Sequence, residues 1–139
     1  PTRLTEAELD FIAGALCDDK KHLAGTEHLM LGEYGCVTDL YASNTVIGVV
    51  ATNAKLTKDE ANKLASIAHD GLARAVRPAH TTFDGDTLFT MATGEVDEIN
   101  FNVVSLMAAR AVETAIVRGV RAAEPLGGAP TCRDLFGDI

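Results

Sequence analysis

Two runs of β-branched and apolar residues constrain the fold of this chain more than any other feature of its sequence. The first run, Thr45–Thr52, reads TVIGVVAT and does not alternate between apolar and polar residues. Such a run is typical of a strand that is buried on both faces of a sheet. The second run, Thr87–Thr93, predicts another strand that ends at Gly94. The fold class therefore depends on what connects and covers these two strands.

Helical patterns fill most of the remaining sequence. Thr5–Glu8 and Thr57–Glu60 are capping-box patterns, in which a Thr and a Glu three residues later satisfy each other's backbone N–H groups at the start of a helix. We expect the first helix to run through about Lys20 and the second to stop near Pro78. A third helix is expected over about Val96–Ala123, followed by an irregular tail. The predicted order is helix, strand, helix, strand, helix, which is an α/β arrangement.

This arrangement is incomplete by itself. The chain is 47% hydrophobic but only 5% aromatic, so aliphatic side chains must build its core. Two strands cannot bury three apolar helices, and an isolated strand pair is only marginally stable in water. We therefore expect further strands, and a partner chain that supplies them.

Charge and cysteine content exclude several classes of partner. The chain has 12 Lys and Arg against 20 Asp and Glu, a net charge of −8, and no basic run. Nucleic acid and anionic membrane surfaces are excluded as partners, because phosphate contacts need Lys or Arg. The three cysteines are far apart and form no CxxC pair, which predicts reduced thiols and a cytoplasmic protein. The sequence begins at Pro1 and not at Met, so we expect that processing or cutting made this end.

A hydroxyl and two carboxylates are predicted to meet at one edge of the sheet. Asn44 and Thr45 precede the first strand, and Asp84 and Asp86 precede the second. If the strands are parallel neighbours, their N-terminal ends lie together. Thr is a weak nucleophile unless a base activates it, and one available base is its own α-amino group after the preceding bond is cut. The residues alone leave an alternative open, a plain strand residue and an ordinary Asp-Gly-Asp turn.

Other candidates carry weaker signals. His80 lies four residues before Asp84 and could orient it, although a histidine that caps the loop fits equally well. His69 with Asp70 reads as a helix-end charge pair, and the spacing of His22 and His28 does not suit a zinc site. Asp84 and Asp86 lack the fuller oxygen set of a calcium loop, and no Gly-rich phosphate loop precedes a helix. We therefore expect neither a metal nor a cofactor.

Several linked blocks of the sequence closely resemble one family. They occur in the same order from about Asn44 to the C-terminus: NTVIGVVATNA at 44–54, HDGLAR at 69–74, RPAHT at 77–81, FDGDTLF at 83–89 and PTCRDLF at 130–136. The family is the DmpA type, whose members are self-processing L-aminopeptidase/D-esterases, β-aminopeptidases and nylon-oligomer hydrolases. Blocks in the same order make this resemblance far more specific than a single motif.

The resemblance implies a precursor that cuts itself before a Ser or Thr. Thr45 matches that nucleophile and Asn44 the residue that gives up its carbonyl, so residues 1–44 would end an α-subunit and residues 45–139 would form a β-subunit. Asp84 and Asp86 match the acidic pair beside the nucleophile in the nylon-oligomer hydrolase branch. The implied fold is a four-layered αββα sandwich, similar to that of the N-terminal nucleophile hydrolases, of which this chain supplies only part.

Two departures from the family pattern stand out. Val46 occupies a position that is often Thr in the family, and either residue fits a strand. Only 44 residues precede Thr45, whereas the family has a much longer α-subunit that also carries an oxyanion-stabilising Asn. The implied partners are therefore the remainder of the α-subunit, further copies of the αβ unit in a homo-oligomer, and a small amide or peptide substrate.

The function that this resemblance implies is hydrolysis of short peptides or oligoamides by an N-terminal threonine. An acyltransferase of the ornithine acetyltransferase type is an alternative, since it has a similar fold and a self-released Thr. A second alternative is an unprocessed, non-catalytic homologue that acts as a binding subunit.

Overall fold

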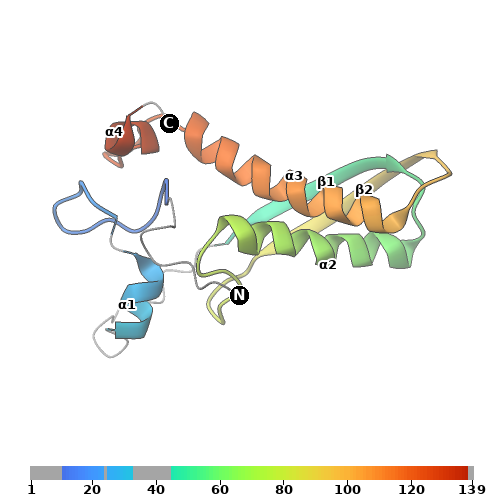
Figure 1. Ribbon diagram of the computed structural model, residues 1–139, viewed down its shortest axis with the longest axis horizontal. Helices are drawn as coiled ribbons and strands as arrows, with labels where there is room; N and C mark the ends of the chain where they lie inside the picture. The colour runs from blue at the N-terminus through green and yellow to red at the C-terminus, as the bar shows by residue number, and fades with distance from the viewer. Residues whose placement is uncertain (1–10, 24, 33–44, 138–139) are drawn as a thin grey trace. The chain divides into compact units, whose positions relative to one another are not determined.

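The computed structural model describes residues 11–23, 25–32 and 45–137. The chain forms two compact units, one built from residues 1–34 and 118–139 and the other from residues 35–117, and each is described by itself. The helices and strands are α1 (Thr26–Gly32), β1 (Ile47–Ala54), α2 (Lys58–Ala75), β2 (Thr87–Val96), α3 (Phe101–Ala122) and α4 (Cys132–Phe136). They are labelled in Figure 1. The chain is therefore of mixed α/β class, as the two strand-forming runs predicted.

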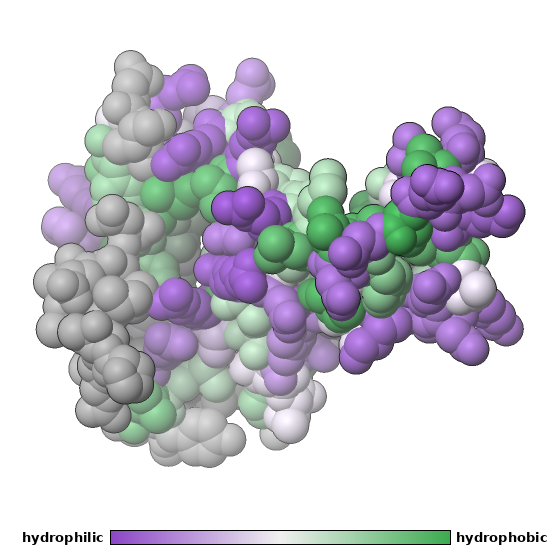
Figure 2. Space-filling model, turned by 45° about the vertical axis from the view of Figure 1, so that its right-hand side comes forward, coloured by the Kyte–Doolittle hydropathy of each residue, from purple (hydrophilic) through white to green (hydrophobic). Residues whose placement is uncertain are grey.

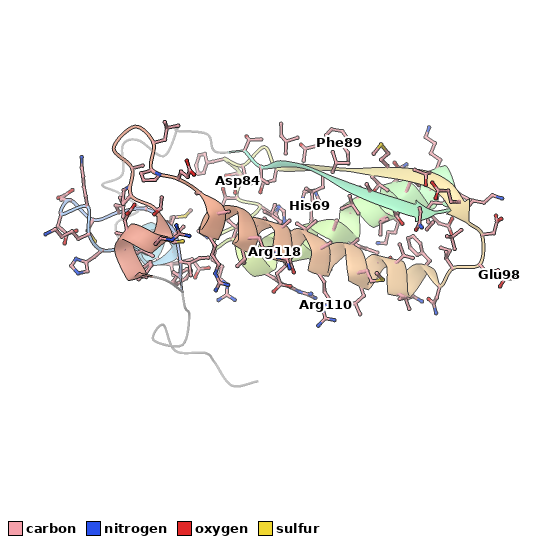
Figure 3. The ribbon with its side chains drawn as sticks, turned by 90° about the horizontal axis from the view of Figure 1, so that it is seen from above. His69, Asp84, Phe89, Glu98, Arg110 and Arg118 are labelled. Atoms are coloured by element: carbon pink, nitrogen blue, oxygen red, sulfur yellow. The ribbon has the colours of Figure 1, made fainter. Side chains whose placement is uncertain are left out.

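The second unit is built on a pair of parallel strands. β1 pairs with β2 in a register that sets Ile47 opposite Thr87 and Ala51 opposite Met91. A parallel pair needs a long crossover, and α2 provides it. In Figures 1 and 3, α2 and the part of α3 in this unit run along the same face of the strand pair. The core between them is aliphatic, and its buried members are Val50, Leu64, Ala68, Leu88 and Ala108.

The opposite face of the strand pair is apolar and exposed. Ile47 and Val49 of β1 are 72% and 62% exposed, and Phe89 and Met91 of β2 are 55% and 58% exposed. Figure 3 shows Phe89 on the side of the sheet away from the helices. The expectation that β1 is buried on both faces therefore holds for one face only within the described residues. The apolar character of the second face fits a strand whose cover comes from elsewhere.

The capping box predicted at the start of α2 is present. The hydroxyl of Thr57 accepts a hydrogen bond from the Glu60 N–H at 3.2 Å, and the Glu60 carboxylate accepts one from the Thr57 N–H at 2.9 Å. The Thr57 hydroxyl also donates to this carboxylate. These bonds favour the charged form of Glu60, so its pKa lies below the ordinary value, mainly because of the Thr57 N–H.

We expect Thr57→Ala to lower the free energy of unfolding by about 1 kcal/mol, the usual cost of losing an N-cap, as measured by urea unfolding.

The contribution of the Glu60 carboxylate to stability depends on pH. Because its pKa is lower in the folded chain, its contribution is present above the ordinary Glu range and is lost as the pH falls through the folded pKa. Urea unfolding of wild type and Glu60→Gln at neutral and acidic pH checks this. The difference between the two should shrink in acid, and a constant difference would contradict the assignment.

Gly71 lets α2 and α3 approach each other closely. A Cβ atom built on Gly71 would lie 2.0 Å from the carbonyl oxygen of Ala109 and 3.0 Å from the Cβ of Val112. The first obstacle is backbone, so a side chain at position 71 would require the two helices to move apart. The glycine in the HDGLAR block is therefore needed for packing.

Gly71→Ala should lower the free energy of unfolding by about 1–3 kcal/mol, the range for overpacking a well-filled core. A matched control exists in α3, since a Cβ on Gly119 would meet nothing within 4 Å. Gly119→Ala should leave stability unchanged or raise it by up to about 1 kcal/mol, because Ala favours a helix over Gly. Denaturant unfolding of both variants checks this, and equal effects would show that the Gly71 contact does not limit helix packing.

In the first unit, the structure differs from the first predicted helix. Over residues 11–23 the chain is not helical, and Leu16 pairs with Leu23 in an isolated antiparallel bridge. The carboxylate of Asp19 accepts hydrogen bonds from the N–H groups of Lys21 and His22 at 2.9 and 3.2 Å. Asp side chains that bond to nearby backbone favour turns over helix, so the apolar spacing did not decide the local structure. The remainder of that predicted helix lies outside the described residues.

The C-terminal tail is more ordered than we expected. Residues 132–136 form α4, with Thr131 as its N-cap. The hydroxyl of Thr131 accepts from the Asp134 N–H at 3.2 Å, and the Asp134 carboxylate accepts from the Thr131 N–H at 2.8 Å. These bonds lower the pKa of Asp134. The Thr-x-x-Asp capping pattern is present in the sequence, but the Pro and Gly residues before it favoured an irregular tail over a helix.

The outer side of α3 is partly apolar. Val103, Leu106 and Met107 are 52%, 53% and 64% exposed. Figure 2 shows apolar side chains at the surface among the polar ones. Within the described residues, no helix combines the length and the apolar character that crossing a bilayer requires.

Candidate functional site

The N-terminal ends of β1 and β2 lie side by side, as predicted. The N–H of Thr87 donates to the carbonyl oxygen of Val46 at 2.8 Å, which begins the parallel ladder. The N–H of Val46 donates to the Asp86 carboxylate at 2.9 Å. The parallel register therefore brings residues 40 positions apart in the sequence into contact at one edge of the sheet. This is the edge at which the sequence placed Thr45, Asp84 and Asp86.

The side chain of Thr45 lies against Gly85. A Cβ atom on Gly85 would come within 2.9 Å of the Thr45 hydroxyl oxygen and 3.6 Å of its methyl carbon. Thr45 itself is exposed. The glycine between the two aspartates thus leaves room for the threonine hydroxyl, a role that the sequence did not reveal. The other half of the predicted cleavage site, Asn44, lies outside the described residues.

Asp86 anchors the residue that follows Thr45. One carboxylate oxygen accepts from the Val46 N–H, and the other lies 3.6 Å from Nδ1 of His80. The Asp86 side chain is only 8% exposed. The resemblance implied that this carboxylate lies beside Thr45, and in the described residues it bonds to the next N–H along the chain. It therefore fixes the backbone beside the threonine.

Asp84 shapes the turn before β2. Its carboxylate accepts from the Thr81 N–H at 2.7 Å, and its own N–H donates to the Thr81 carbonyl at 3.1 Å. The hydroxyl of Thr87 donates to the carbonyl of Gly85 at 3.0 Å and closes the turn on its other side. Figure 3 shows Asp84 at the end of the strand pair. Its described contacts are therefore those of a turn that presents Gly85 and Asp86 to Thr45.

His80 contacts Asp86 and not Asp84, the residue that one of the two alternatives for His80 had it orient. Its backbone is left-handed, with φ of 58°, which is uncommon for a residue other than Gly. Its Nε2 lies 3.5 Å from the backbone carbonyl of His69, and the two rings are 4.9 Å apart. His69 lies inside α2 and not at its end, where a charge pair was expected, and its contact with His80 brings it to this edge. No sequence spacing indicated it, because the contact depends on how the chain returns after α2.

The remaining histidine and metal candidates lie elsewhere. His22 contacts Asp19 at 2.6 Å in the first unit, and this contact also lowers the pKa of Asp19, after the larger effect of the Lys21 N–H. In the part of the chain that the structure describes, no three His, Cys, Asp or Glu side chains gather as metal ligands would. The described residues of this edge carry a hydroxyl on Thr45, carboxylates on Asp84 and Asp86, and the imidazole of His80.

The described residues thus define a mixed α/β chain with a threonine hydroxyl at the carboxylate-bearing edge of a parallel strand pair. The sequence model of Peptidase family S58 matches residues 6–132, and the chain belongs to this family. The resemblance to the DmpA type is therefore confirmed. Membership implies a fold like that of the N-terminal nucleophile hydrolases.

Named relatives agree with this assignment. The chain is 41% identical to an uncharacterized aminopeptidase of Mycobacterium tuberculosis (strain ATCC 25618 / H37Rv), over 67% of this chain and 31% of the relative. It is 40% identical to an uncharacterized aminopeptidase of Mycobacterium leprae, over 70% and 31%. It is also 41% identical to a 6-aminohexanoate-oligomer endohydrolase of Kocuria sp. (strain KY2), over 40% and 16%. The matched part of this chain thus corresponds to 31% of the length of these mycobacterial relatives.

Proposed function

We propose that this chain is part of a self-processing amide hydrolase whose nucleophile is Thr45. The observation that carries this proposal is the threonine hydroxyl packed over Gly85, beside the carboxylate that holds the following N–H. Membership of Peptidase family S58 supports hydrolysis of peptide or amide bonds as the chemistry.

In the first stage the Thr45 hydroxyl oxygen attacks the carbonyl carbon of Asn44. The bond between that carbon and the Thr45 nitrogen breaks, and the nitrogen takes up the proton that the hydroxyl gives up. The product is an ester between Asn44 and the Thr45 oxygen. Water then hydrolyses this ester and restores the hydroxyl. Cleavage thus yields residues 45–139 as a β-subunit with a free amino group on Thr45, and residues 1–44 as the end of an α-subunit.

In the second stage the free α-amine of Thr45 acts as the general base for its own hydroxyl, which attacks the substrate amide. Asp86 would hold the amine and hydroxyl, and its bond to the adjacent N–H of Val46 supports this role. Asp84 supports Asp86 through the turn that it closes with Thr81. Donors to the developing oxyanion would come from the rest of the α-subunit, and one such donor is typically worth ~10²–10³ in rate.

The exposed sheet face supports a larger sandwich around this site. The apolar side chains of Ile47, Val49, Phe89 and Met91 would contact a second sheet in a four-layered αββα fold. The remainder of the α-subunit would supply that layer. The exposed apolar residues of α3 would pack against further αβ units in a homo-oligomer.

The proposed substrates are short peptides or oligoamides with a free amine. The names of the relatives, aminopeptidase and 6-aminohexanoate-oligomer endohydrolase, support this class. Incubating the full-length protein with aminoacyl p-nitroanilides, β-peptides and 6-aminohexanoate oligomers tests it. Release of free amine from at least one of these is expected. Transfer of the substrate's acyl group to ornithine instead of water would favour the acyltransferase alternative. No turnover, in a chain that stays uncut between Asn44 and Thr45, would favour the binding-subunit alternative.

A further inference from the structure

The imidazole of His80 is held by two features besides Asp86. Its backbone takes the left-handed conformation that Gly and Asn adopt most readily, so the loop accepts a cost to place this ring. On its other side the ring meets the carbonyl and the imidazole of His69, in the C-terminal half of α2. His80 therefore links the helix to the carboxylate at the start of β2.

The position of Asp86 depends on what meets its two oxygens. One oxygen accepts from Val46, and the contact described for the other is Nδ1 of His80 at 3.6 Å. A carboxylate that is only 8% exposed has little access to water, so a partner on the second oxygen determines how it sits. The separation is longer than a direct hydrogen bond. Contacts of this kind are often long in unliganded sites and shorten in the reacting complex.

We propose that His80 is a positioning residue, which holds Asp86 so that Asp86 keeps the backbone next to Thr45 in place for reaction. The inference rests on the proposed function, since it matters only if Thr45 is the nucleophile. His69 serves as the platform of His80, through its backbone carbonyl and its ring. The series of contacts runs from His69 of α2 through the imidazole of His80 and the Asp86 carboxylate to the Val46 N–H. His80 itself does not touch the reacting atoms.

Two substitutions separate the ring from the backbone conformation. His80→Gly keeps the left-handed backbone and removes the imidazole, whereas His80→Asn tolerates the same backbone and keeps an N–H donor. In the full-length protein, His80→Gly should slow self-cleavage and lower kcat by about 10–100-fold, since a small misplacement at a reacting centre can cost about 10²-fold. KM and the thermal midpoint should change little. His80→Asn should recover part of the lost kcat, and an unchanged kcat in His80→Gly would overturn the inference.

A double-variant cycle provides a readout that a purely structural role would not change. If His80 acts through Asp86, adding His80→Gly to Asp86→Ala, which removes the contact with the Val46 N–H, should lower kcat little further, because the two residues act as a unit. Fully multiplicative losses would overturn the inference. Thr45→Ala is measured alongside. If Thr45→Ala keeps activity, the proposed function itself fails, and if Thr45→Ala is inactive while His80→Gly is fully active, only the role of His80 fails.

Discussion

Thr45→Ala is expected to abolish both self-cleavage and amide hydrolysis. The variant removes the hydroxyl that lies against Gly85 and leaves the neighbouring Val46 anchor to Asp86 intact. Loss of a nucleophile that acts together with its base typically lowers kcat by about 10⁴-fold or more. The chain should therefore fold and remain uncut. Intact mass and an amidase assay on the purified protein measure both effects.

Thr45→Ser is the matched control for this prediction. Serine keeps the hydroxyl and loses only the methyl group, whose carbon would lie 3.6 Å from a Cβ at position 85. It should therefore be cut and should retain measurable hydrolysis. If Thr45→Ala were as active as Thr45→Ser, the hydroxyl would not be the nucleophile.

Asp86→Asn is expected to lower kcat by about 10²-fold while the protein stays folded. The amide oxygen of Asn can still accept from the Val46 N–H, so the first contact of the strand pair survives. The negative charge that lies next to Nδ1 of His80, and that we propose holds the Thr45 amine, is lost. Positioned acid–base groups typically contribute about 10²–10⁴ in rate, and the lower end suits a carboxylate that acts through an amine. Steady-state kinetics and a thermal unfolding curve check the two parts of this prediction.

The opposite end of the same strand pair offers a matched control. Asp97 pairs with Lys55 at 2.6 Å and its side chain is 71% exposed. Exposed ion pairs contribute little, so Asp97→Asn should leave kcat and stability nearly unchanged. Equal losses in the two variants would show that the effect at position 86 is a general response to losing an aspartate.

The sequence was sufficient for the parts of the fold that depend on local signals. The capping box at Thr57 forms as predicted, and both strand-forming runs are strands. The site could be anticipated because parallel strands align their N-terminal ends, which set Val46 against Asp86. Regular periodicity and strand polarity therefore gave the positions of the candidate residues.

The parts that could not be predicted depend on tertiary contacts or on competing local bonds. The turn around Asp19 replaced an expected helix, because its carboxylate bonds to nearby N–H groups. The contact between His69 and His80 needs the path of the loop after α2, and the role of Gly85 needs the position of the Thr45 hydroxyl. None of these has a sequence spacing of its own.

The prediction that β1 is buried on both faces was only half right, because one face of the strand pair is apolar and exposed. A run without alternation reports that both faces meet apolar surroundings in the assembled protein. In the described residues the helices cover one face, and Ile47 and Phe89 remain exposed on the other. The sequence pattern therefore fits the proposed sandwich, in which a second sheet covers this face.

The most direct test of the proposed function is the intact mass of the full-length protein purified from its producing cells. Self-processing at Asn44–Thr45 predicts two fragments, one of which begins with Thr45. N-terminal sequencing of that fragment should read Thr-Val-Ile-Gly. A fully active protein in which the bond between Asn44 and Thr45 is intact would contradict the account.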